Sequence, residues 1–536
     1  MTKKLLSIHN LTISFPSSKG RVEVVKGLNL NINKGQIVGL AGESGSGKSV
    51  TAMSILRLNP SPPAKVESGS IKFLGSDLLT MPLGDLQKLR GQDISVIFQE
   101  PMTALSPLHS IGSQLVETLQ LHQNINKSKA LKIAMHWLQK VEIPDVANKI
   151  KAYPFELSGG QRQRVMIAMA LMLAPKLIIA DEPTTALDVT IQKQIFKLML
   201  DLKNADTAML FITHDMGVIW QMCDRVAVMQ NGYVVEEGAV KQLLTHPKHA
   251  YTQQLIKSVP RLNTNDKHIS QSPKEVLLQV QDLHTWYPIK QGIFAKTVDY
   301  VKAVNGVSFD IRQGETLALV GESGCGKTTL GRTLMGLEVA KAGAINFAEV
   351  DLLKHNLKHT RQMRQSMQMV FQDPYSALNP KMRICDIITE ALVVHNIITA
   401  NQRWVRATEL LDEVGLSSKI LNRYPHEFSG GQRQRICIAR ALGLKPKLII
   451  LDESLSALDV SIQAKVIELL QELKQRHRLS YLFISHDLSV VSQISDRIAV
   501  MQKGKIVEIG LPSQIIANPQ NSYTQTLISA IPVLGS

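Results

Sequence analysis

The chain has 536 residues, 44% of them hydrophobic and 20% charged, with a formal net charge of +15 at pH 7. Such a length suits two or three domains, and this composition is that of a globular protein rather than a disordered one. No apolar run reaches the ~18 residues that a membrane-spanning helix needs. No apolar signal-peptide core precedes the first strand-like segment, so we expect a cytoplasmic protein.

The excess of basic residues does not point to a nucleic-acid partner. Lysines and arginines are spread along the chain without a basic tail, so we expect a generally basic surface and no nucleic acid. The four cysteines, Cys223, Cys325, Cys385 and Cys437, lie far apart without metal-ligand spacing, which is typical of free thiols in a reducing compartment.

The first motif in chain order is a phosphate-binding loop. A strand-like run at residues 36–40 leads into GESGSGKS, from Gly42 to Ser49, and a helix is expected to follow. Glycines let such a loop curl until its N–H groups point at the β- and γ-phosphates, and the helix N-terminus adds positive potential. Lys48 should reach the phosphates and Ser49 should ligate Mg²⁺.

Further motifs follow in the first half of the chain. Gln99 precedes a segment with helical spacing at residues 130–141, and LSGGQRQR begins at Leu157, at the predicted start of another helix. The apolar run at 177–180 is typical of a buried parallel strand and ends in Asp181 and Glu182. There Asp181 can hold Mg²⁺ through water, and Glu182 can polarise an attacking water.

The whole set occurs again in the second half, in the same order and at nearly the same spacing. The second phosphate loop is GESGCGKT, from Gly321 to Thr328, and FSGGQRQR begins at Phe428. Both halves end in similar tails, which contain YTQ at Tyr251 and Tyr523. Such a repeat predicts two tandem domains, at residues 1–262 and 276–536, joined by a polar linker at 263–275.

Taken together, the motifs resemble those of ATP-binding cassette (ABC) ATPases. The resemblance implies an α/β fold with two tandem nucleotide-binding domains, each a RecA-like parallel-sheet core with an antiparallel β subdomain and a helical signature subdomain. In that family two cassettes meet head to tail, and each ATP lies between one cassette's phosphate loop and the other's signature. Both sites look complete, so we expect both to hydrolyse ATP.

The resemblance assigns a role to each motif residue. The catalytic residues implied are Glu182, Glu453, His214, His486, Gln99 and Gln372. The ATP-binding residues implied are Gly42, Glu43, Ser44, Gly45, Ser46, Gly47, Lys48 and Ser49, then Gly321, Glu322, Ser323, Gly324, Cys325, Gly326, Lys327 and Thr328, with the signatures Ser158, Gly159, Gly160, Gln161, Ser429, Gly430, Gly431 and Gln432. The Mg²⁺ ligands implied are Ser49, Gln99, Asp181, Thr328, Gln372 and Asp452.

Three residues carry additional hypotheses. Phe15 and Tyr287, each followed by proline, match across the repeat and resemble the aromatic residue that stacks on adenine, although a lone aromatic near a strand end is usually part of the core. Cys325 replaces Ser46 in the second phosphate loop. Beside a helix N-terminus its thiol pKa should be lowered and the thiol reactive; alternatively, cysteine is simply a small residue that fits.

The stretches after Gln99 and Gln372 and the YTQ tails resemble the ATPases of peptide, dipeptide and nickel importers. The fused halves and short linker look most like the microcin C-type peptide importer, with the glutathione importer as a near relative. This implies two transmembrane permease partners and, indirectly, an extracytoplasmic solute-binding protein. The protein would then sit peripherally on the cytoplasmic side of the inner membrane. A soluble tandem cassette acting on ribosomes or DNA remains the alternative.

Overall fold

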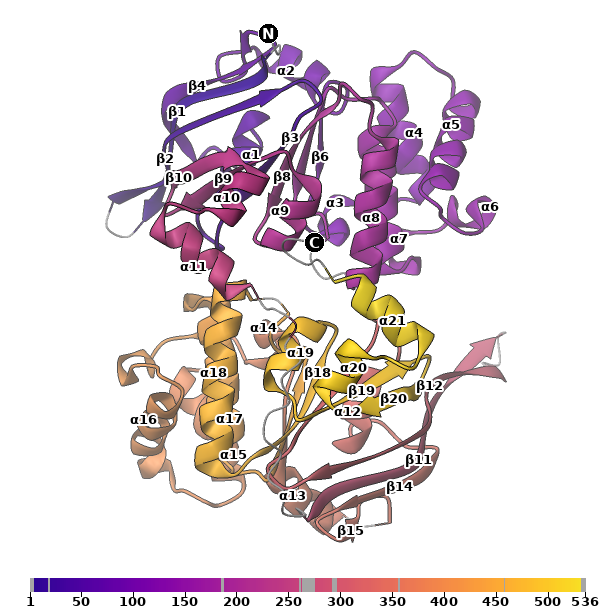
Figure 1. Cartoon of the computed structure of the whole chain (residues 1–536), viewed down its shortest axis with the longest axis vertical. Helices are drawn as coiled ribbons and strands as arrows, with labels where there is room; N and C mark the ends of the chain where they lie inside the picture. Colours follow the sequence, from indigo (N-terminus) through magenta and orange to yellow (C-terminus); the bar gives the residue numbers. More distant parts are fainter. Residues whose placement is uncertain are drawn as a thin grey trace. The chain divides into compact units, whose positions relative to one another are not determined.

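The computed structural model describes residues 4–17, 20–184, 188–259, 262, 275–291, 296–354, 357–456 and 458–531. The chain divides into two compact units, one built mainly from Met1–Leu187 and Ile191–Val259 and the other mainly from Pro260–Ile531 (Figure 1). The expected linker, except for Glu275, lies outside the described residues, so the domain boundaries placed there remain predictions.

Within the described part of the first unit, the strands form a four-stranded antiparallel sheet and a six-stranded, mainly parallel sheet. The antiparallel sheet has the order β2-β1-β4-β5 and consists of β1 (Lys4–Ser17), β2 (Gly20–Asn33), β4 (Lys65–Phe73) and β5 (Ser76–Asp77). The second sheet has the order β10-β9-β3-β8-β7-β6 and consists of β3 (Ile37–Ala41), β6 (Ile94–Ile97), β7 (Leu177–Asp181), β8 (Ala208–Thr213), β9 (Arg225–Gln230) and β10 (Tyr233–Ala239). Only β10 runs antiparallel to its neighbour in this sheet, among the strands described.

Some helices of the first unit flank this sheet, and others, among them α4 and α5, form a separate group beside it (Figure 1). Those before the signature are α1 (Lys48–Ile55), α2 (Leu83–Leu89), α3 (Pro101–Ala104), α4 (Ile111–His122), α5 (Lys127–Lys140) and α6 (Val146–Lys149). Those from the signature onward are α7 (Gly159–Leu171), α8 (Val189–Leu202), α9 (Met216–Met222), α10 (Val240–Thr245) and α11 (Ala250–Ser258).

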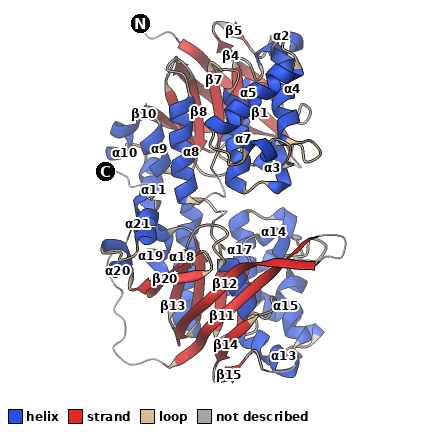
Figure 2. Ribbon diagram, turned by 90° about the vertical axis from the view of Figure 1, so that its right-hand side faces the viewer, coloured by secondary structure: helices blue, strands red, loops and turns tan. Residues whose placement is uncertain are grey.

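The second unit repeats this plan over its described residues, with the sheet orders β12-β11-β14-β15 and β16-β17-β18-β13-β19-β20. Figure 2 shows the first of these two sheets. The antiparallel sheet consists of β11 (Val276–Gln291), β12 (Lys296–Arg312), β14 (Ala342–Phe347) and β15 (Val350–Asp351). The mainly parallel sheet consists of β13 (Thr316–Val320), β16 (Met367–Val370), β17 (Leu448–Asp452), β18 (Ser480–Ser485), β19 (Arg497–Gln502) and β20 (Lys505–Gly510).

The helices of the second unit follow the same order as those of the first. They are α12 (Lys327–Leu334), α13 (Leu357–Ser366), α14 (Pro374–Ala377), α15 (Ile384–Val394), α16 (Arg403–Glu413), α17 (Gly430–Leu442), α18 (Val460–His477), α19 (Leu488–Ile494), α20 (Pro512–Ala517) and α21 (Ser522–Ser529). The α/β class and the two repeated cassettes predicted from the motifs are therefore confirmed. Among the described helices, none combines the length and apolar character needed to span a membrane.

The central strands form where continuous apolar runs occur in the sequence. Every residue of β3, β7, β13 and β17 is buried. This is what a parallel sheet covered on both faces requires. The predicted helix at 130–141 is α5, which begins three residues earlier because Asn126 caps it by accepting a hydrogen bond from Lys129 N–H.

The group of helices α4 to α7 has an apolar core of its own. Leu115, Ala134, Leu138 and Val165 are almost fully buried within it. A different set of apolar side chains packs the antiparallel sheet against one face of the central sheet. The signature helix α7 thus belongs to a helical subdomain, while the phosphate loop emerges from the central sheet.

Candidate functional site

Each phosphate loop connects the end of a central strand to the start of a helix. In the first unit it joins β3 to α1, and Gly47 precedes the helix with φ 102° and no side-chain cap. A Cβ on Gly47 would lie 2.7 Å from Val24 O, and one on Gly326 would lie 2.0 Å from Ala303 O, so the curl requires glycine at both positions. The uncapped N–H groups at these helix starts can bind an anion.

The lysine of each loop is buried and bonded to the backbone of its own loop. Lys48 Nζ donates to Gly42 O at 2.7 Å and to Glu43 O at 2.8 Å. Lys327 Nζ donates to Gly321 O at 2.8 Å and to Glu322 O at 3.0 Å. The ammonium is therefore held inside the curl, where phosphate oxygens would lie.

A hydroxyl and a carboxylate meet beside each loop. Ser49 Oγ donates to Asp181 Oδ1 at 3.0 Å, and Thr328 Oγ1 donates to Asp452 Oδ1 at 3.0 Å. Burial raises the pKa of Asp181 and of Asp452, while the neighbouring hydroxyl opposes the rise. Two adjacent hard oxygen donors of this kind suit Mg²⁺, which takes its remaining ligands from water and phosphate.

The glutamate after each of these aspartates adopts an unusual backbone conformation. Glu182 has φ 44° and Glu453 has φ 43°, in the left-handed region that non-glycine residues rarely occupy. The parallel sheet holds both in place, because their N–H groups donate to Ile212 O and Ile484 O at 3.0 Å. Such strain is concentrated at functional sites, where it aims a side chain.

Three strands bring the glutamine, glutamate and histidine of each unit together. In the first unit Gln99 Nε2 donates to Glu182 Oε2 at 2.9 Å, and His214 Nδ1 lies 3.2 Å from Glu182 Oε1. These residues follow β6, β7 and β8, whose carboxyl ends meet at one edge of the sheet. The constellation predicted from the sequence is therefore assembled within the unit.

The second unit has the same constellation, and Lys327 lies close to its glutamate. Gln372 Nε2 donates to Glu453 Oε2 at 2.8 Å, His486 Nδ1 lies 3.7 Å from the same oxygen, and Lys327 Nζ lies 3.5 Å from Glu453 Oε1. Burial alone would raise the pKa of Glu453, but the hydrogen bond and charge of His486, with Lys327, bring it below its ordinary value. Burial opposes protonation of His486, yet Glu453 outweighs it and raises the pKa of His486.

The signature residues begin the helices α7 and α17 and cap them. Ser158 Oγ accepts from Gln161 N–H at 3.3 Å, and Gln161 Oε1 accepts from Ser158 N–H at 3.2 Å. Ser429 and Gln432 form the same reciprocal pair at 3.4 and 3.2 Å. The serine and glutamine of each signature therefore form a capping box, a structural role that the sequence analysis did not assign.

Known protein families match both halves of the chain, in which these two sites lie. The ABC transporter family matches residues 25–185 and 304–456. The chain belongs to the ABC transporter family. The C-terminal region of oligopeptide/dipeptide transporters matches at 235–284 and 507–536, once in each half.

Several relatives match this ABC protein from end to end. The chain is 49% identical to the Peptidoglycan transport ATP-binding protein YejF of Agrobacterium fabrum, covering 99% of this chain and 96% of the relative. It is 46% identical to the Uncharacterized ABC transporter ATP-binding protein YejF of Escherichia coli K12 (99% and 100%) and 43% identical to the Glutathione import ATP-binding protein GsiA of Pectobacterium atrosepticum (99% and 90%). The chain is thus an ATP-binding, ATP-hydrolysing ABC subunit.

The first phosphate loop of this ABC ATPase has a buried polar atom that suits ATP. Ser46 Oγ is buried and makes no hydrogen bond to any described residue. A buried hydroxyl normally has a partner, and a phosphate oxygen of the nucleotide can provide one. When bound with the nucleotide, Mg²⁺ neutralises charge on the β- and γ-phosphates.

The aromatic candidates for adenine stacking differ in their surroundings. Phe15 is partly buried against the core of its unit, whereas Tyr287 is 37% exposed, and its partial burial raises its pKa. The stacking role of both residues remains a prediction.

The lowered pKa predicted for Cys325 is wrong. The residue is only 7% exposed and packs in the apolar core, and burial raises the pKa of its thiol although Lys327 opposes the rise. A Cβ on Gly321 would lie 2.8 Å from Cys325 Sγ, so the sulfur fills the space beside the loop. The alternative hypothesis, a small residue that fits, agrees with the packing.

One contact with the phosphate loop was missed by the sequence analysis. The hydroxyl of Tyr251 accepts a hydrogen bond from Glu43 N–H at 3.0 Å, and the hydroxyl of Tyr523 accepts one from Glu322 N–H at 3.0 Å. The recurrence of YTQ in both tails was the available signal. This recurrence indicates that the two tails correspond, but it does not reveal a contact with the phosphate loop some 200 residues away.

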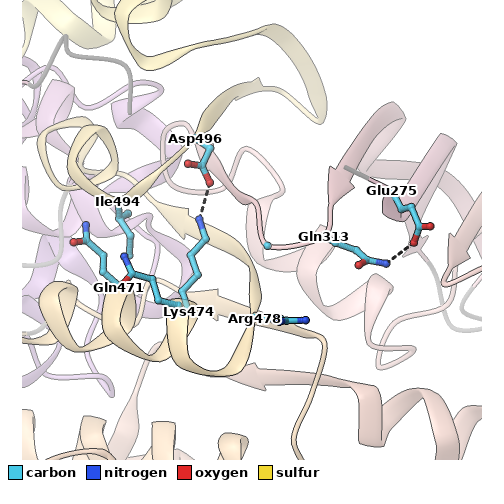
Figure 3. A pocket seen from close by; sticks show the side chains of 9 residues that line it. Glu275, Gln313, Gln471, Lys474, Arg478, Ile494 and Asp496 are labelled. Atoms are coloured by element: carbon cyan, nitrogen blue, oxygen red, sulfur yellow. Dashed lines mark hydrogen bonds and ion pairs between the residues drawn. The ribbon is translucent and has the colours of Figure 1, made fainter. Parts of the chain in front are cut away.

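Figure 3 shows a cavity of about 640 Å³ in the second unit, whose lining residues differ from those of the nucleotide site. It is lined by Gly314, Arg478 and Asp496, which precede β13, β18 and β19 and so lie at the amino ends of these strands. The phosphate loop follows the carboxyl end of β13. Lys474 pairs with Asp496 at 2.6 Å in this cavity, so its charge is compensated there.

Proposed function

We propose that the chain is the energy-coupling ATPase of an importer for peptides or peptide-like solutes, of the microcin C and oligopeptide type. The observation that carries this proposal is the double match to the C-terminal region of oligopeptide/dipeptide transporters, one copy behind each cassette. Relatives named for peptidoglycan transport and glutathione import support it, because both solutes contain short peptide chains.

The positions of the side chains support the following chemical roles in this proposal. Lys48 and Lys327 bind phosphate oxygens, and Ser49 with Asp181, like Thr328 with Asp452, holds Mg²⁺. Glu182 and Glu453 act as general bases toward the attacking water, and the glutamine and histidine beside each one orient its carboxylate. Substrate positioning and charge stabilisation supply most of the catalysis in phosphoryl transfer.

The sequence resemblance further supports composite ATP sites. In this proposal the first phosphate loop, with Glu182 and His214, is completed by the signature Ser429-Gly430-Gly431. The second, with Glu453 and His486, is completed by Ser158-Gly159-Gly160. Double variants can test this pairing, because residues that serve one site couple energetically and residues of separate sites do not.

The matched variants are Ser429→Ala in the Glu182→Gln and Glu453→Gln backgrounds. If Ser429 serves the site of Glu182, its replacement slows the ATP turnover that remains in Glu453→Gln protein and leaves that of Glu182→Gln protein unchanged. The reverse result would assign the signature to its own half. Ser158→Ala provides the mirror-image control.

The partners proposed are two transmembrane permeases and, through them, an extracytoplasmic solute-binding protein, with the chain peripheral on the cytoplasmic side of the inner membrane. Fractionation of cell extracts at low and high salt tests this placement. Retention with membranes at high salt, together with co-purification of hydrophobic proteins in mild detergent, supports the importer. Recovery with ribosomes or DNA would overturn the importer proposal.

Uptake of a labelled oligopeptide by cells lacking the chain tests the solute class. We expect wild-type protein to restore uptake and the Glu182→Gln/Glu453→Gln double variant to fail. The double variant must still be found in the membrane fraction, which separates loss of ATP hydrolysis from loss of assembly. If cells lacking the chain took up the labelled oligopeptide as fast as wild-type cells, the solute class would be contradicted and the ATPase assignment would stay intact.

A further inference from the structure

The C-terminal helix of each unit reaches back to its phosphate loop through one hydroxyl group. Tyr251 lies in α11 and Tyr523 in α21, and their side chains are almost fully buried. Their hydroxyls accept the N–H of Glu43 and Glu322, both at 3.0 Å. The same contact is made in both halves, between segments about 200 residues apart.

The turn before each tyrosine's helix is hydrogen-bonded to a glutamate on an edge strand. In the first unit the carboxylate of Glu236, on β10, accepts Lys248 N–H at 2.9 Å and His249 N–H at 3.1 Å. In the second unit Glu508, on β20, accepts Gln520 N–H at 2.8 Å and Asn521 N–H at 3.2 Å. The turn before the helix is thereby fixed to an edge strand of the central sheet.

The edge strand completes a closed path back to the loop. In the first unit β10 pairs with β9, β9 pairs with β3, and β3 leads into Glu43. In the second unit β20, β19 and β13 form the same series. The tyrosine hydroxyl therefore joins two ends of one continuous hydrogen-bonded path.

At the first loop, the residue that the hydroxyl binds is held from both sides. Glu43 donates its N–H to Tyr251, and its carbonyl oxygen accepts Lys48 Nζ at 2.8 Å. The lysine must also serve the phosphates, so its hold on this carbonyl changes with the nucleotide. The hydrogen bond that Glu43 N–H donates to the hydroxyl of Tyr251 involves neither the lysine nor a phosphate oxygen.

We propose that Tyr251 and Tyr523 are positioning residues that hold the start of each phosphate loop and make its nucleotide affinity depend on the C-terminal region. The inference rests on ATP binding alone and not on the transported solute. A failed transport assay would leave it standing, and its own failure would leave the importer proposal standing.

Tyr251→Phe and Tyr523→Phe in the full-length protein test this inference, because each removes one hydroxyl and keeps the ring. Tyr481→Phe is the matched control. Its hydroxyl is also buried and donates to Leu470 O at 2.9 Å, within the core of the second unit. We expect each test variant to raise the KM for ATP at its site and the dissociation constant of a fluorescent ATP analogue about 3- to 10-fold, the effect of one lost hydrogen bond.

The turnover number should stay within about twofold of wild type, because the reacting groups keep their positions. Unchanged affinity, or a change no larger than that of Tyr481→Phe, would overturn the proposal. So would a fall in turnover number with unchanged KM.

Amide hydrogen exchange gives a second measurement, which does not depend on nucleotide. In wild-type protein without nucleotide, the N–H groups of Glu43 and Glu322 should exchange slowly, and in the phenylalanine variants they should exchange at least about tenfold faster. Burial raises the pKa of Tyr523, so the hydroxyl at the second site stays protonated and this protection should be independent of pH between 6 and 9. Fast exchange of these amides in the wild type would by itself refute the inference.

Discussion

The side-chain amide of Gln372 donates a hydrogen bond of 2.8 Å to the carboxylate of Glu453. The amide of Gln99 makes the same bond to Glu182 at 2.9 Å. Each glutamine follows the outermost parallel strand of its sheet, at the beginning of the helical subdomain. A displacement of that segment would therefore alter the orientation of the glutamate, which is the general base in the proposed function.

Loss of the general base should slow ATP hydrolysis. Glu182→Gln and Glu453→Gln keep the size of the side chain and remove its basicity, so each should reduce turnover at its own site by roughly 10²–10⁴-fold. Phosphate release under saturating MgATP measures this. Because each unit has the full constellation, we expect both substitutions to slow the total rate, and the double variant to be nearly inactive. If one single variant kept the full wild-type rate, hydrolysis at both sites would be refuted.

The aspartates beside the loops should control the requirement for Mg²⁺. Asp181→Asn and Asp452→Asn remove a charged oxygen that is bonded to Ser49 or Thr328, so the Mg²⁺ concentration for half-maximal activity should rise about tenfold or more. Titration of ATPase activity with Mg²⁺ at fixed ATP measures the shift. Asp85→Asn is the surface control, because Asp85 pairs with the exposed Lys88 on α2. An unchanged Mg²⁺ requirement in both loop variants would contradict the ligand assignment.

The pair of His486 and Glu453 should make stability depend on pH. The pKa of His486 is raised above 6.5, so the stability from its protonated form is fully present below 6.5 and is lost as the pH rises through the raised value. The pKa of Glu453 is lowered below 4.5, so its contribution is present above 4.5 and is lost as the pH falls through the lowered value.

Thermal unfolding of wild-type protein and of His486→Gln, followed from pH 5 to pH 9, tests this dependence. We expect the melting temperature of the variant to lie furthest below that of wild type near pH 6, and the difference to become smaller as the pH rises. A difference in melting temperature that stays constant across the whole range would show that protonation of His486 does not contribute.

Cys325 should be protected from alkylation in the folded protein. Its burial and raised pKa leave little accessible thiolate, so maleimide should label it slowly until the protein is unfolded in guanidinium chloride. Mass spectrometry of the labelled peptides measures this directly. Cys325→Ser should keep ATPase activity, since serine occupies the matching position at Ser46. Rapid labelling of Cys325 in native protein would contradict the packing.

Much of the site could be predicted from short motifs. The phosphate loops, the acidic pairs and the signatures follow from local chemistry, because glycine, lysine and a helix start at fixed spacing make a phosphate cradle wherever they occur. The buried strands β7 and β17 were predictable for a similar reason, since an uninterrupted apolar run ending in a carboxylate suits the centre of a parallel sheet. The thiol of Cys325 shows the limit of this reasoning: proximity to a helix N-terminus is a local property, but its burial depends on residues far along the chain.

By itself, then, the sequence determined the class of fold and the identity of the chemical groups, which depend on neighbours within a few residues, and the repeat, which is visible because the same motifs recur in the same order. Only the tertiary structure decided how these groups are held. The bonds from Gln99 and Gln372 and the hydroxyls of Tyr251 and Tyr523 join segments from about 80 to 200 residues apart. The left-handed conformation of Glu182 and Glu453 is fixed by hydrogen bonds to the neighbouring strand. Such contacts arise because the parallel sheet gathers the carboxyl ends of its strands at one edge, an arrangement that no local pattern of residues encodes.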